Sequence, residues 1–136
     1  MTQPTHHQTH NAGRHLAVAE ALLRGYDAKM DGPRTYIEVN GQRVQVQVAA
    51  KGAWQIGDVD SYTSATIETA VLVNVTDGAR EFHVCPGDDL RAGVRQRHDD
   101  FVASQGGQRP RNPDSKHSAI YPEHVAEWGD DWERLA

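Results

Sequence analysis

The segment from residue 35 to residue 49 constrains the fold more than any other part of the sequence. Two stretches with strict period-two alternation, Thr35–Val39 and Gln42–Ala49, flank the dipeptide Asn40-Gly41. Asn-Gly is the dipeptide that a tight type I′ turn prefers, so this segment predicts a β-hairpin. The second strand then has an apolar face that requires a core and an opposite face that is mostly polar: Val44, Val46 and Val48 against Arg43, Gln45, Gln47 and Ala49.

Size and charge exclude several classes of protein. The chain has 136 residues, the length of one domain, and a formal net charge of −5. This charge has the wrong sign for a protein that coats nucleic acid nonspecifically, although it permits a local basic patch. The single cysteine, Cys85, excludes an internal disulfide framework and suits a cytoplasmic protein. No apolar run has membrane-spanning length and no glycine-rich phosphate loop is present, so neither a membrane nor a nucleotide cofactor is expected as a partner.

The rest of the sequence predicts a flexible tail at 1–11 and a single domain at 12–136. A helix is predicted at 12–24, followed by the hairpin at 35–49. Two further strands follow at 69–75 and 81–85, then a long helix at 88–104 and a short last helix from 121. The strand at 69–75 is almost continuously apolar, which is typical of a central strand covered on both faces. We expect a long loop at 105–118. The order α-β-β-β-β-α predicts an α+β fold, with a four-stranded sheet flanked by helices.

Smaller patterns make more local predictions. Asn11 is a candidate N-cap of the first helix, and the last helix would present Val125, Trp128 and Trp132 on one face. His83 and Cys85 alternate along the strand at 81–85, where burial explains both better than metal binding does.

Two segments resemble parts of a known enzyme superfamily. Residues 13–26 are similar to the first helix of the PD-(D/E)XK nucleases, and Arg-Val-Gln-Val-Gln-Val at 43–48 is similar to their (D/E/Q)-x-K strand. The order of elements is also similar, over roughly residues 13–86. This resemblance to restriction endonucleases and Holliday-junction resolvases implies a restriction-endonuclease-like core.

The resemblance also identifies the positions on which catalysis depends. In the superfamily, Mg²⁺ lies between an Asp on one strand and a carboxylate on the next, and a Lys two residues later helps to activate water. These positions correspond to Tyr36, Gln47 and Ala49 in this sequence. Because Tyr and Ala remove two of the charges, we expect a degenerate, non-catalytic domain that binds nucleic acid or protein. No cofactor is then expected, and an oligomer is compatible with the sequence.

Two alternatives remain open. In the first, the chain is an active Mg²⁺-dependent DNA endonuclease, a metal-dependent phosphodiesterase whose catalytic site has migrated to Glu38, Gln47 and Lys51, with Glu38 and Asp58 as metal ligands. In the second, the chain is a small phage or defence-system interaction protein without a nucleic-acid role. The simplest interpretation of Glu38 and Gln47 is that they form the solvated face of the hairpin.

A set of basic residues in the second half of the sequence is suited to phosphate contacts, because guanidinium and ammonium groups pair with phosphate oxygens. These candidate nucleic-acid-binding residues are Arg91, Arg95, Arg109, Arg111 and Lys116.

Overall fold

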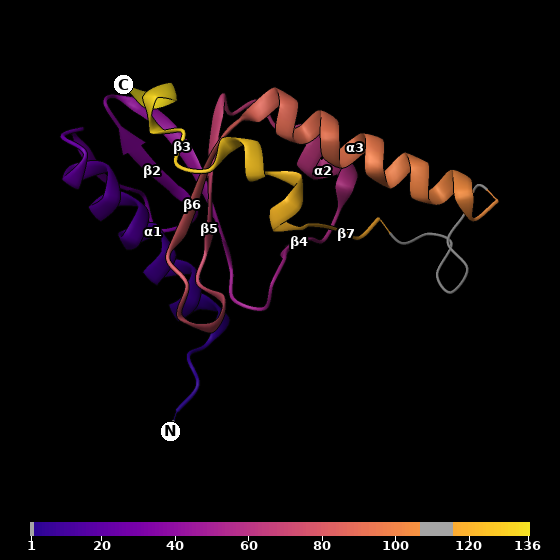
Figure 1. The fold of residues 1–136 in the computed structure, drawn as a ribbon, viewed down its shortest axis with the longest axis horizontal. Coiled ribbons are helices and arrows are strands. Elements are labelled where there is room, and N and C mark those ends of the chain that lie inside the picture. Colours follow the sequence, from indigo (N-terminus) through magenta and orange to yellow (C-terminus); the bar gives the residue numbers. More distant parts are fainter. Residues whose placement is uncertain (1, 107–115) are drawn as a thin grey trace.

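A mixed five-stranded sheet forms the centre of the molecule (Figure 1). The computed structural model describes residues 2–106 and 116–136. The helices are α1 (His6–Leu23), α2 (Val59–Thr63) and α3 (Gly87–Ser104). The strands are β1 (Ala28–Asp31), β2 (Tyr36–Val39), β3 (Gln42–Ala49), β4 (Trp54–Ile56), β5 (Thr69–Asn74), β6 (Glu81–Pro86) and β7 (Ser118–Ile120). The strand order is β1-β2-β3-β5-β6, while β4 and β7 form a separate pair. The α+β prediction is confirmed, with five strands in place of four.

The hairpin forms as predicted. β2 and β3 pair antiparallel with Val39 opposite Gln42, so the loop has two residues. Asn40 and Gly41 have φ angles of 50° and 82°, the positive values that a type I′ turn requires at both positions. Asn40 also fixes the turn to the chain end, because its Nδ2 donates a hydrogen bond to the carbonyl of Leu135 at 2.9 Å.

The edge strand β1 lies between the first helix and the hairpin, in a segment for which the sequence predicts no element. It pairs antiparallel with β2, with Lys29 opposite Glu38 and Asp31 opposite Tyr36. The apolar residues Ala28 and Met30 alternate with the charged residues Lys29 and Asp31, and this four-residue pattern is the shortest that indicates a half-buried strand. The charges suit an edge position, since a lysine on an edge strand discourages pairing with another chain.

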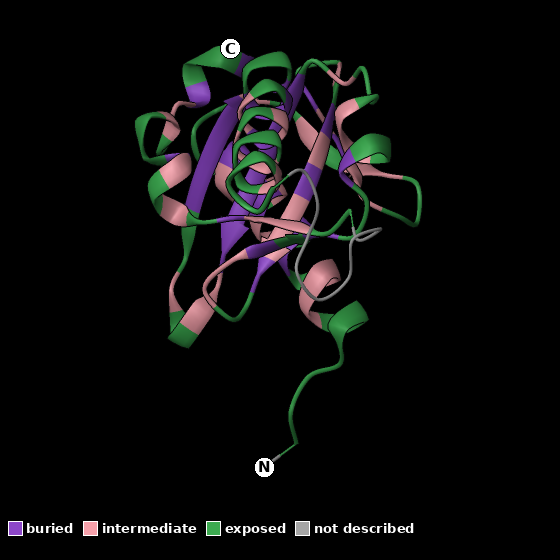
Figure 2. Cartoon of the chain, turned by 90° about the vertical axis from the view of Figure 1, so that its right-hand side faces the viewer, coloured by how far each residue is buried: buried purple, intermediate pink, exposed green. Residues whose placement is uncertain are grey.

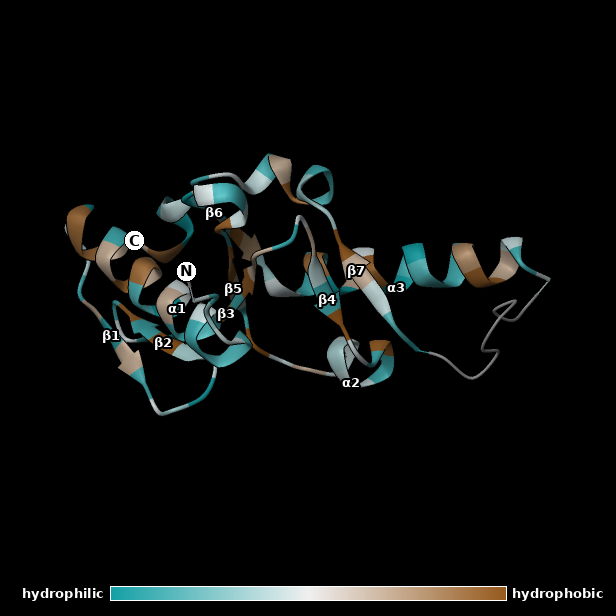
Figure 3. Cartoon of the chain, turned by 90° about the horizontal axis from the view of Figure 1, so that it is seen from below, coloured by the Kyte–Doolittle hydropathy of each residue, from teal (hydrophilic) through white to brown (hydrophobic). Residues whose placement is uncertain are grey.

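β5 is the central strand that its composition predicts. It lies parallel to β3 and antiparallel to β6, and all six of its residues are buried. Figure 3 shows hydrophobic colours along this strand. The parallel pairing requires a crossover from β3 to β5, which contains β4 and α2. The crossover therefore carries α2 to the face of the sheet opposite α1.

Each face of the sheet has its own apolar core. On one face, α1 packs against alternate residues of the strands, including Ile37, Val44 and Val46. On the other, α3 and the segment 54–59 cover Leu72 and Cys85. In Figure 2 the buried residues gather in the central strands and the exposed ones on the outer sides of the helices. The predicted apolar face of β3 is thus confirmed as a core face.

The first helix begins earlier than the sequence predicted. It starts at His6 because Thr5 forms a capping box with Gln8, in which each side chain accepts a hydrogen bond from the other's backbone N–H. Thr5, and not Asn11, is therefore the N-cap. Residues 6–11, expected in a tail, form the first part of α1.

Gly13 allows α1 to approach β3 closely. A Cβ atom at this position would lie 2.2 Å from Cγ2 of Val48. We expect Gly13→Ala to lower the free energy of unfolding by about 1 kcal/mol, because the overpacking cost exceeds the gain in helix propensity. Urea denaturation measures the difference. Gly57→Ala is the matched control, since no atom lies within 4 Å of its added Cβ. A Gly13→Ala variant as stable as the parent would contradict this tight packing.

The C-terminal segment differs from the single helix that was predicted. It forms three short 3-10 turns, Pro122–His124, Ala126–Trp128 and Trp132–Leu135. Val125 joins the core under α3, whereas Trp132 joins the core under α1 and packs against the ring of Phe82. The one-face prediction for Val125, Trp128 and Trp132 is therefore wrong, because the chain crosses from one core to the other between them.

Candidate functional site

A cavity of about 500 Å³ lies where β3 continues beyond its partner β2. The last strand pair is Tyr36 with Gln45, so β3 has no partner strand on this side after residue 46 among the described residues. The other sides of the cavity are formed by the start of α1 and by the segment after β3. The lining polar residues are Gln3, His6, Thr9, His10, Thr35, Gln47, Lys51 and Gln55.

Two hydrogen-bonding residues fix the walls of this cavity. Thr35 donates from Oγ1 to the carbonyl of Val46 at 2.6 Å, which holds the start of β2 against β3. Arg14 on α1 is 1% exposed and donates from Nη2 to the carbonyls of Gly32 and Tyr36, at 2.8 and 2.6 Å. The helix, the β1–β2 loop and the strand are thereby joined next to the cavity.

The side chain of Gln47 is held by a residue of α2, on the face of the sheet opposite α1. The hydroxyl of Tyr62 on α2 donates to its Oε1 at 2.6 Å. Burial raises the pKa of Tyr62 well above its usual range, so this hydroxyl keeps its proton and remains a donor. The amide oxygen of Gln47 is therefore occupied by Tyr62.

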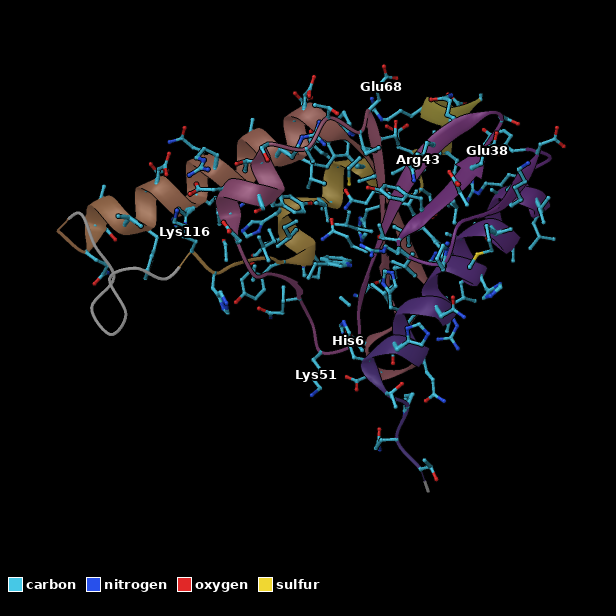
Figure 4. The ribbon with its side chains drawn as sticks, turned by 180° about the vertical axis from the view of Figure 1, so that it is seen from behind. His6, Glu38, Arg43, Lys51, Glu68 and Lys116 are labelled. Carbon is cyan, nitrogen blue, oxygen red and sulfur yellow. The ribbon has the colours of Figure 1, made fainter. Side chains whose placement is uncertain are left out.

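The electrostatic character of the cavity is neutral to basic. No Asp or Glu is among the described residues that line it, and Lys51 supplies an exposed ammonium. Burial lowers the pKa of His10, and a hydrogen bond with the backbone of Arg34 opposes this shift. Figure 4 shows His6 and Lys51 on neighbouring segments at this end of the molecule. An anion is the complementary ligand.

The structure separates the three residues of the hypothetical migrated catalytic site. Gln47 and Lys51 line the cavity, but Glu38 does not. Glu38 is opposite Arg43, so Gln47 lies four residues further along β3, roughly 13 Å away at the rise of a β-strand. Glu38 instead pairs with Lys29 at 3.2 Å, near the opposite end of the sheet (Figure 4).

Tyr36 and Ala49, which stand at the two altered motif positions, make packing contacts within the fold. The guanidinium of Arg43 lies over the ring of Tyr36, 3.8 Å from its centroid. Ala49 is buried in the core under α3. Neither residue lines the cavity, where Thr35 takes the place nearest to the start of β2.

The second carboxylate proposed as a metal ligand has a structural role. Asp58 is the N-cap of α2, and its side chain accepts hydrogen bonds from the backbone N–H groups of Asp60 and Ser61. In the parts of the chain that the structure describes, no three His, Cys, Asp or Glu side chains are placed to hold a metal ion. Because Mg²⁺ requires oxygen ligands, chiefly carboxylates, the residues of the cavity do not fit it.

The predicted phosphate-binding residues occupy different environments. Arg91 is 7% exposed and donates to the carbonyl of Ile67 and to Asp88, so it lies within the fold and not on an open surface. Arg95 and Lys116 are on the surface, where both pair with Asp60. Arg109 and Arg111 lie outside the described residues.

The surface cluster at Asp60 makes stability sensitive to acid. Hydrogen bonds from Lys116 and Arg95 lower the pKa of Asp60 to about 2. A lowered pKa in the folded state means that the ionised carboxylate stabilises the fold above about pH 4, and that this contribution is lost as the pH falls towards 2. We expect the stability difference between the parent and Asp60→Asn to shrink over this range in urea titrations. Added salt should also reduce this stability difference at neutral pH, since the carboxylate of Asp60 is exposed. A difference independent of pH would contradict the assignment.

Sequence reasoning missed the residues that α1 contributes to the cavity. His6 and His10 were placed in a tail, yet both lie on the first turns of α1. The capping box Thr5–Gln8 is the signal that could have located the helix start. The nuclease pattern does not identify Thr35, because the motif position on this strand corresponds to the next residue, Tyr36.

One solved structure provides a comparison for the whole fold. A bacterial homing endonuclease, I-Ssp6803I, superposes with a TM-score of 0.56 over 98% of this chain and 92% of its own. The sequence identity is 13%, so the likeness shows that the two chains share a fold and nothing finer. No protein-family model and no curated protein matches the chain. Within the described residues, no helix combines the length and apolar character needed to cross a membrane.

Proposed function

We propose that the chain is a DNA-binding domain with a degenerate PD-(D/E)XK-like site, which holds a backbone phosphate without a metal ion. The single observation that supports this proposal is the composition of the cavity at the end of β3. It contains the motif residue Gln47 together with Lys51, His6 and His10, and no carboxylate lines it among the described residues.

The charge distribution favours this location for phosphate binding. Several other basic side chains are paired with carboxylates, as in Lys29–Glu38, Arg43–Asp31 and Arg95–Asp60. Lys51 has no ion pair within the described residues. An acidic protein can therefore still offer a local positive site, and binding there should weaken as salt rises.

A cleavage and binding assay tests the proposal. Fluorescence anisotropy with labelled linear, nicked and branched DNA in EDTA is expected to show saturable binding at low salt. The same substrates with Mg²⁺ or Mn²⁺ are expected to remain uncut. Metal-dependent cleavage that disappears in Lys51→Ala would refute the non-catalytic assignment, and absence of binding to all three substrates would refute the DNA-binding assignment.

A further inference from the structure

A second cavity, of about 280 Å³, lies between α3 and the C-terminal turns. It has an apolar side formed by Leu90 and Trp128 and a polar side that includes Arg97 and His124. None of its lining residues belongs to the cavity at the end of β3.

Arg97 lies in this cavity and has no neutralising carboxylate partner within residues 2–106 and 116–136. Its Nε atom is buried and has no hydrogen-bond partner among the described residues, and its guanidinium makes no ion pair there. The guanidinium lies over Gly93, where a Cβ atom would come within 3.0 Å of Nη1. Desolvation lowers the pKa of Arg97, as expected for a partly buried cation with no counter-ion in the described part of the chain. A glycine on the same helix thus makes room for a guanidinium whose buried Nε–H has no acceptor among the described residues.

His124 provides a second donor. Its Nδ1 accepts a hydrogen bond from the backbone N–H of Tyr121 at 3.1 Å. In the neutral imidazole the proton must then be on Nε2, which is the nitrogen that remains for a ligand. Burial and the nearby charge of Arg97 both lower the pKa of His124, so the neutral form predominates at neutral pH.

The remaining lining residues restrict the kind of anion. Asp89 and Glu127 also line the cavity, and neither is within ion-pair distance of Arg97. Their charges oppose a multiply charged ligand such as a phosphate. A planar carboxylate matches the fork of a guanidinium, and Trp128 and Leu90 suit an apolar group attached to it.

We propose that this cavity binds a small monoanionic carboxylate with an apolar body, through the guanidinium of Arg97 and the Nε2–H of His124. The proposal goes beyond the DNA-binding function and does not depend on it, because the two cavities share no residue.

Benzoate is a suitable probe, with benzyl alcohol as the neutral control of similar shape and inorganic phosphate as the competing anion. In ¹⁵N-resolved NMR spectra of the full chain, benzoate is expected to shift the Nε–Hε resonance of Arg97 saturably at millimolar concentration. Arg97→Gln should weaken benzoate binding roughly tenfold or more, since hydrogen bonds to a charged group are lost. Benzyl alcohol should produce no saturable shift, and phosphate should bind more weakly than benzoate.

Two further readouts separate a binding role from a structural one. Arg97→Gln removes a desolvated charge without breaking a hydrogen bond within the described residues, so its melting temperature should equal or exceed that of the parent. Gly93→Ala should remain folded, because Ala favours the helix, yet weaken benzoate binding at least threefold by displacing the guanidinium. Unchanged benzoate binding in Arg97→Gln, tighter binding of phosphate, or a marked loss of stability in Arg97→Gln would each overturn the proposal.

Discussion

Substituting Arg14 with Ala is expected to lower the free energy of unfolding by about 3 kcal/mol, the largest stability effect predicted for this chain. The guanidinium is buried and donates to two backbone carbonyls, those of Gly32 and Tyr36. Its removal leaves both carbonyls without this donor and opens space between α1 and the start of β2. The relief of desolvating a buried charge offsets only part of this cost.

Urea denaturation of Arg14→Ala and of two controls measures this effect. Arg14→Lys should recover less than half of the lost stability, because an ammonium cannot reproduce the forked geometry. Arg24→Ala removes a half-exposed arginine near the end of the same helix, where it pairs with Glu20. That change should cost less than about 1 kcal/mol. Equal losses for Arg14→Ala and Arg24→Ala would show that burial of Arg14 is not important for stability.

The largest effect on function is expected from reversing the charge in the cavity at the end of β3. Lys51→Glu should weaken DNA binding in EDTA by roughly tenfold or more, since a phosphate contact is replaced by repulsion. The slope of the logarithm of the binding constant against the logarithm of the salt concentration should also become shallower by about 1, because one phosphate contact is lost. Because Lys51 is exposed, the stability of the fold should be almost unchanged.

Lys29→Glu is the matched control for this experiment. It changes the net charge by the same amount, but its exposed side chain pairs with Glu38 towards the other end of the sheet. Its effect on DNA affinity should be small. If both variants weaken binding equally, net charge and not the cavity determines affinity, and the proposed site is excluded.

The parts of the fold that were predicted depend on local patterns. Asn40-Gly41 fixes its own turn and, with it, the pairing of the flanking strands. The uninterrupted apolar run of β5 similarly identifies a strand covered on both faces. β1 was harder to predict, because its alternation covers only four residues and its pairing with β2 is a tertiary contact.

The candidate site was predictable on one side only. Gln47 and Lys51 follow from the position of the motif on β3, whereas His6 and His10 come from a helix whose polar first turns resembled a tail. The sequence alone could have shown that Glu38 does not share a site with Gln47. A two-residue turn places it opposite Arg43, and therefore far along the strand from Gln47.

The most direct test of metal-free phosphate binding is an NMR titration of the full chain with a short DNA duplex in EDTA. We expect saturable shifts in the imidazole resonances of His6 and His10 and in the backbone amides of residues 47–55. Signals from Lys29 and Glu38 should remain almost unchanged. Shifts that require Mg²⁺, or that appear only away from the cavity at the end of β3, would contradict the proposed DNA-binding site.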